Sequence, residues 1–190
     1  MQRLEAGGAS FALRTWGDSG SPPLLFWHGA GDTGAQFERA GRTLATEADL
    51  FVVAPDAPGH GDTPPLGDDD YRPSRLGALA AALLDALGLE KVVFAGFSWG
   101  GSVGCHFAAD FPRRTRALAL IEGGHIDFRD VVEYEPPSSR EAAVAAHGLE
   151  GALHWGSLQE PAAATYTALC AAGTPVLLVT TKWPCGRSRR

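Results

Sequence analysis

The stretch from Val92 to Gly101 restricts the fold more than any other part of the sequence. It begins with Val-Val-Phe-Ala, and an apolar run without polar alternation is typical of a parallel strand covered on both faces. Gly96 and Gly100 then flank Ser98 in the spacing G-x-S-x-G, which allows a sharp strand-to-helix turn that exposes the serine hydroxyl. Such a turn holds its serine in a sparsely populated backbone region at roughly 1–3 kcal/mol, so the pattern indicates a nucleophile elbow.

Two loops upstream of the serine also follow apolar runs. Residues 24–27 lead into His-Gly-Ala-Gly at 28–31, and residues 51–55 lead into Asp-Ala-Pro-Gly-His-Gly-Asp-Thr at 56–63. An alternating stretch at 10–16 predicts an early antiparallel edge strand, and residues 73–88 have helical periodicity. The alternation of strands and helices predicts an α/β fold, with a mostly parallel sheet and helices on both faces.

These motifs together resemble the α/β-hydrolase family, which has a G-x-S-x-G elbow downstream of a His-Gly turn and a D-x-P-G-H-G loop. The resemblance implies a serine hydrolase that acts on ester or related acyl substrates through an acyl-enzyme at Ser98. It also implies an oxyanion hole formed by the backbone N–H groups of Ala30 and Trp99. No metal or cofactor is implied. His28 and His60 lie in loops whose role in this family is structural.

The catalytic partners of the serine are not in their usual positions. A serine nucleophile needs an imidazole to accept its proton and a carboxylate to orient that imidazole. In the family the acid usually follows the seventh strand and the histidine an eighth, but here Thr181 and Lys182 follow the last apolar run and the sequence ends at Arg190. Some relatives carry the acid at the end of the sixth strand, where this chain has Glu122, with His125 in the same loop. Glu122 and His125 are therefore the candidate acid and base.

The resemblance also divides the chain into parts. Residues 1–125 are expected to form the hydrolase core, 126–172 a small helical cap or lid, 173–181 the last core strand, and 182–190 an irregular basic tail. The fold would then lack the C-terminal strand and helix of the family. Such a truncation leaves the edge of the last strand unpaired, which predicts self-association or a partner over that edge. The basic, patternless ending also suggests that the reading frame shifts, or that the gene is cut, near residue 181.

Two hypotheses of function remain open at this point. One is an active serine hydrolase. The other is a truncated or non-catalytic homologue, a pseudoenzyme that keeps the pocket but lacks the usual acid and histidine. Without a base, an intact oxyanion hole gives roughly 10³–10⁴-fold acceleration over water, which is little for an enzyme.

Composition excludes several other classes. The net charge of −6, with basic residues clustered only at the C-terminal end, argues against nucleic acid as a partner. No apolar run approaches the roughly 18 residues of a membrane span and the start has no signal-peptide pattern, so we expect a cytoplasmic protein that binds a small-molecule acyl substrate. The 3 cysteines include no C-x-x-C pair, which favours neither a disulfide framework nor a zinc site.

Overall fold

The computed structural model describes residues 1–124 and 137–180, which form a seven-stranded sheet in the order β1-β2-β4-β3-β5-β6-β7. Pairing is antiparallel between β1 and β2 and between β2 and β4, and parallel between all other neighbours. The mostly parallel sheet expected from the sequence is confirmed. The strands are β1 (Gln2–Ala6), β2 (Ala9–Trp16), β3 (Pro23–Trp27), β4 (Phe51–Pro55), β5 (Val92–Phe97), β6 (Thr115–Ile121) and β7 (Val176–Val179).

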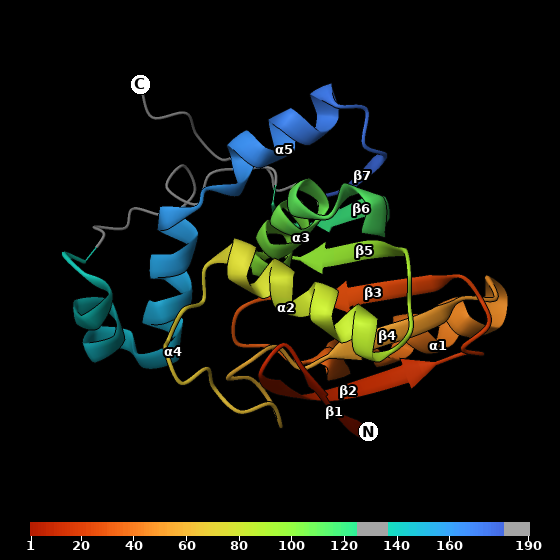
Figure 1. Cartoon of the computed structure of the whole chain (residues 1–190), viewed down its shortest axis with the longest axis horizontal. Coiled ribbons are helices and arrows are strands. Elements are labelled where there is room, and N and C mark those ends of the chain that lie inside the picture. Colours follow the sequence, from red (N-terminus) through yellow and green to blue (C-terminus); the bar gives the residue numbers. More distant parts are fainter. Residues whose placement is uncertain (125–136, 181–190) are drawn as a thin grey trace.

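Helices cover both faces of this sheet, as predicted. Helix α1 (Glu38–Glu47), preceded by the short helix η1 (Gly34–Phe37), packs on one face, and α2 (Pro73–Ala86) and α3 (Trp99–Asp110) pack on the other (Figure 1). Successive residues of a strand point to opposite faces, so the apolar run of β3 sends Leu25 and Trp27 into the larger core and Leu24 and Phe26 into the smaller one. The unbroken apolar runs follow from this double coverage.

The position of the N-terminal strands corrects one expectation. The sequence predicts that the strand at 10–16 lies at the edge of the sheet, but β2 lies between β1 and β4, and β1 is the edge strand. Strand β1 escapes prediction because most of its residues are exposed, so it lacks an apolar pattern of its own. Its position in the sheet follows from pairing with β2 along its whole length.

Two helices of the predicted cap segment lie in the described part of the chain. Helix α4 (Arg140–Gln159) stands beyond the carboxyl ends of the parallel strands, and α5 (Ala162–Ala171) packs against α3 before the chain enters β7 (Figure 1). Gly148 interrupts α4 with φ 57° and ψ −135°, a conformation that bends the helix. The division of the chain into core and cap stays a prediction, and residues 125–136 and 181–190 lie outside the described residues.

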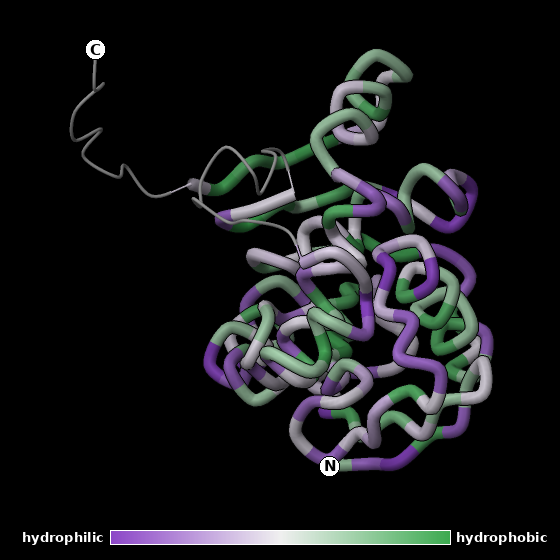
Figure 2. The backbone as a smooth tube through the Cα atoms, turned by 90° about the vertical axis from the view of Figure 1, so that its left-hand side faces the viewer, coloured by the Kyte–Doolittle hydropathy of each residue, from purple (hydrophilic) through white to green (hydrophobic). Residues whose placement is uncertain are grey.

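The last strand forms an exposed edge of the sheet. Strand β7 pairs in parallel with β6, and the side chains of Leu177, Leu178 and Val179 are 62%, 41% and 44% exposed. Figure 2 shows this strand as a hydrophobic segment at the margin of the molecule. Pairing of this edge with a second copy stays a prediction.

Candidate active site

Ser98 occupies the turn between β5 and α3. Its backbone has φ 51° and ψ −118°, and Trp99 is already the first residue of the helix. A positive φ is uncommon for a residue other than glycine and is found most often where function requires it. The serine is half-buried, so its side chain is not sealed into the core.

Glycines beside the serine allow three chain segments to meet there. A Cβ added to Gly100 would collide with the backbone of Trp27 at the end of β3, and one added to Gly123 would collide with the backbone of Ser98 itself. Gly29 is also close, since its added Cβ would lie 3.3 Å from the Ser98 Cβ. The ends of β3, β5 and β6 therefore converge on Ser98 with almost no space between their backbones.

The two predicted oxyanion donors lie on either side of this junction. Trp99 starts α3, so its N–H is one of the helix N-terminal amides that lack an intrahelical acceptor. Ala30 follows Gly29 in an exposed turn at the end of β3. Neither amide donates a hydrogen bond within the described part of the chain. The role of these two amides as an oxyanion hole stays a proposal.

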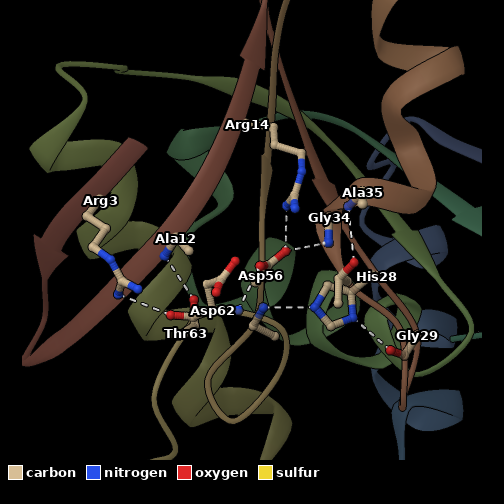
Figure 3. Close-up of polar contacts among 12 residues, drawn as sticks. Arg3, Ala12, Arg14, His28, Gly29, Gly34, Ala35, Asp56, Asp62 and Thr63 are labelled. Atoms are coloured by element: carbon tan, nitrogen blue, oxygen red, sulfur yellow. Dashed lines mark hydrogen bonds and ion pairs between the residues drawn. The ribbon is translucent and has the colours of Figure 1, made fainter. Parts of the chain in front are cut away.

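A buried carboxylate fixes the loops around the site. The side chain of Asp56 is 1% exposed and accepts hydrogen bonds from Arg14 Nη1 at 2.8 Å, Gly34 N at 2.8 Å and Asp62 N at 3.1 Å (Figure 3). It therefore joins β2, the segment after the His-Gly turn, and the 56–63 loop. The sequence motif contained Asp56 but gave it no role; a carboxylate directly after a buried strand was the available signal.

His28 serves as a structural link between two of these loops. Its Nδ1 donates to Gly29 O at 2.7 Å, and its Nε2 accepts from Ala57 N at 2.8 Å (Figure 3). Burial lowers the pKa of His28 to about 4, so the imidazole is neutral at physiological pH. With both nitrogens engaged by the backbone, His28 has no lone pair left to accept the serine proton.

The structure places Glu122 beside the serine. The carbonyl of Ile121 accepts from Ser98 N at 2.8 Å, and Glu122 follows with φ 55° while its N–H donates to Val179 O at 2.9 Å. The candidate acid thus begins a loop held directly beside the serine. His125 lies outside the described residues, and no histidine within 1–124 or 137–180 hydrogen-bonds to Ser98. The acid and base assignments both stay predictions.

A hollow of about 440 Å³ opens between the His-Gly turn, the 56–63 loop and helix α4. Its lining includes Ala30, His60 and, from α4, His147 and Glu150. The sequence placed His147 and His154 in the cap; His147 reaches this hollow, whereas His154 does not line it and has a pKa lowered by burial. In the described ranges, no group of three or more His, Cys, Asp or Glu side chains is arranged to hold a metal ion.

Comparison with known proteins identifies the family. A family model described as the alpha/beta hydrolase fold matches residues 22–160, which includes the His-Gly turn, the 56–63 loop and the elbow. The chain therefore belongs to the alpha/beta hydrolase fold family, as the motifs predicted.

Curated relatives and solved structures agree with this assignment. The chain is 37% identical over 115 residues to a poly(3-hydroxyalkanoate) depolymerase of Ectopseudomonas oleovorans, covering 57% of this chain and 38% of the relative. It is 35% identical over 113 residues to the lipase LipV of Mycobacterium tuberculosis, covering 58% and 40%. The crystal structure of epoxide hydrolase A from Mycobacterium thermoresistibile has 28% identity and a TM-score of 0.61, covering 77% of this chain and 44% of that one. The chain spans well under half the length of these proteins.

One further finding concerns membranes. Among the helices of the described residues, none is both long and apolar enough to cross a bilayer.

Proposed function

We propose that this chain carries the nucleophile and oxyanion hole of a serine hydrolase that cleaves carboxylic esters through an acyl-enzyme. The observation that carries the proposal is the backbone of Ser98, which has φ 51° at the N-terminus of α3, pressed against Gly29 and Gly123. Two curated relatives named as a depolymerase of a polyester and as a lipase support an ester substrate.

In the proposed reaction Ser98 Oγ attacks the ester carbonyl. A bond forms between Oγ and the carbonyl carbon, while the carbonyl oxygen takes up negative charge opposite the N–H groups of Ala30 and Trp99. His125 accepts the hydroxyl proton and passes it to the departing alcohol, and Glu122 orients the imidazole. Water then cleaves the acyl-enzyme by the reverse sequence of proton transfers. The whole activity, including any contribution from residues beyond this chain, is part of the proposal.

A fluorophosphonate probe and p-nitrophenyl butyrate test the proposal. We expect the wild type to be labelled and to hydrolyse the ester, and Ser98→Ala to lose labelling and at least about 10³-fold in kcat/KM. Ser102→Ala is the matched control because Ser102 lies on the same helix, one turn after the elbow, and its loss should change neither readout. Labelling that persists in Ser98→Ala would overturn the assignment of the nucleophile.

The pseudoenzyme alternative is supported by the sequence after β7, where Thr181 and Lys182 stand at the position of the family's usual acid. His125→Ala and Glu122→Gln separate the two functions. If His125 is the base, its loss should lower kcat/KM by about 10²-fold or more while Ser98 remains in place. A wild type with an intact fold, no labelling and no turnover would instead establish the non-catalytic homologue.

A further inference from the structure

Two buried ring nitrogens beside the elbow have no hydrogen-bond partner. Among the described residues, His60 Nε2 and Trp99 Nε1 are both shielded from solvent and unpaired, in side chains of residues that are 5% and 8% exposed. Buried polar atoms are paired in the great majority of cases, so such atoms call for an explanation. Here the two lie on rings in direct contact: the imidazole and indole stack with centroids 5.7 Å apart and planes inclined by 28°.

The backbone determines which nitrogen of His60 carries the proton. His60 Nδ1 lies 3.0 Å from the carbonyl oxygen of Pro58. A carbonyl oxygen can only accept, so in the neutral imidazole Nδ1 holds the hydrogen and Nε2 keeps a lone pair. An indole Nε1–H can only donate. The stacked pair therefore offers one unused acceptor and one unused donor.

The ring of His60 is held rigidly in this arrangement. His28 contacts it edge-on, with centroids 4.9 Å apart and an interplanar angle of 63°. Gly61, the next residue, adopts φ 52°, and a Cβ there would collide with the carboxylate of Asp56, so the loop is tied to that buried group. A donor–acceptor pair fixed in this way is preorganised for a ligand.

We propose that His60 Nε2 and Trp99 Nε1 bind one hydroxyl group of the substrate, close to its reacting carbonyl. The substrates would then be hydroxylated esters, and this inference rests on the proposed function because it places the ester carbonyl at Ser98, the residue before Trp99. A hydroxyl oxygen can accept from one N–H and donate to one lone pair at about 2.9 Å each, and His60 lines the hollow of about 440 Å³ beside the elbow.

The chemistry of the pair excludes the other common polar groups. An ammonium group donates to His60 but cannot accept from Trp99, and a carboxylate accepts from Trp99 but cannot donate to His60. Asp32 and Glu150 line the hollow that His60 also lines, and their negative charges disfavour an anion there. A hydroxyl is neutral and does both.

A panel of simple esters tests the subsite. Ethyl 2-hydroxybutyrate, ethyl 3-hydroxybutyrate and 2-hydroxyethyl butyrate are compared with ethyl butyrate by acid release. We expect at least one hydroxylated ester to exceed ethyl butyrate in kcat/KM by about tenfold, the factor that a single hydrogen bond supplies. In His60→Phe and in Trp99→Phe this ratio should fall toward 1. The double variant should lose no more of the ratio than the stronger single variant, because one hydroxyl bridges both rings.

His106→Phe is the matched control. His106 also has a buried, unpaired Nε2, but it lies on α3 away from the lining of the hollow, so its removal should leave the ratio unchanged. A wild type without preference for any hydroxylated ester would overturn the subsite, and would assign the two unpaired nitrogens to an ordered water. A ratio that falls equally in His106→Phe would also overturn it.

A binding measurement separates this inference from the proposed function. In the Ser98→Ala variant, the indole N–H resonance of Trp99, assigned by its loss in Trp99→Phe, should shift on addition of ethyl 3-hydroxybutyrate and much less with ethyl butyrate. A shift without fluorophosphonate labelling of the wild type would retain the subsite and reject the hydrolase. Labelling of Ser98 with neither shift nor ester preference would retain the hydrolase and reject the subsite.

Discussion

Two carboxylates, Asp56 after β4 and Glu160 after α4, hold the molecule together in different ways. Asp56 accepts three hydrogen bonds, including one from Arg14, with its side chain 1% exposed. Glu160 follows α4 and accepts from Ser74 N at 2.8 Å and Ser74 Oγ at 2.7 Å, with its side chain 21% exposed. The Asp56 carboxylate is therefore sealed from water although its Arg14 partner is 22% exposed, whereas water can reach the Glu160 carboxylate that attaches α4 to α2.

This difference indicates which part of the site can move. A preorganised oxyanion hole requires loops whose positions do not change during reaction, and buried charge networks provide such rigidity. In the proposed function the substrate passes α4, which stands over the carboxyl ends of the strands, and a partly exposed attachment allows that helix to move. The predictions below test whether core and cap differ in this sense.

The largest effect is expected from Asp56→Ala. Removing the carboxylate leaves Arg14 without its partner, and it leaves the buried Gly34 N–H and the part-buried Asp62 N–H without an acceptor. Breaking a buried pair in this way typically costs about 3–5 kcal/mol. The free energy of unfolding from urea denaturation should fall by that amount. Asp62→Ala is the control in the same loop: its side chain is exposed, and its loss should stay within about 0.5 kcal/mol. Equal losses for the two variants would contradict the central role of Asp56.

The second largest effect is expected at acidic pH, where protonation of His28 should lower the free energy of unfolding. Because its folded-state pKa of about 4 lies below the unfolded value of 6.5, the unfolded chain takes up the proton first. The stability that neutral His28 contributes is fully present above pH 6.5 and is lost as the pH falls toward 4, by about 3 kcal/mol in total. Burial shifts the pKa of His154 in α4 in the same direction.

Urea denaturation between pH 8 and pH 4 measures this dependence. In His28→Gln the fall in stability over that range should shrink, while in His147→Gln, at an exposed position of α4, it should remain as in the wild type. A pH dependence that is the same in His28→Gln and in the wild type would show that the proton is taken up elsewhere.

The distance along the chain between contacting residues explains what the sequence could predict. The elbow, the His-Gly turn and the 56–63 loop were recognisable because glycine is required wherever backbones meet, as at Gly100 and Gly123. These requirements act over short stretches of sequence. The network of Asp56 was not recognisable, because its three donors come from segments between 6 and 42 residues away.

Long-range contacts account for the other differences as well. Thr63 stands where serine is commoner in the family loop, and its hydroxyl accepts a hydrogen bond from Ala12 N, 51 residues away on β2 (Figure 3). The stacking of His60 on Trp99 likewise joins the 56–63 loop to the start of α3, so the sequence indicated a structural role for His60 and gave no sign of an unpaired acceptor. Strand β1 was missed because its stability derives from pairing with β2 and not from its own pattern.

The smallest effect is expected from Glu160→Ala, and its character is the sharpest test of the comparison. The variant loses two hydrogen bonds that are partly exposed, so global stability should fall by about 1 kcal/mol. Hydrogen exchange should nevertheless accelerate selectively in α4 and at the start of α2, while β5 and α3 stay protected. Glu150→Ala, which removes an exposed carboxylate of α4, should leave exchange unchanged. If Glu160→Ala instead accelerated exchange equally throughout the sheet, core and cap would be one cooperative unit, and substrate entry would have to occur without any separate movement of α4.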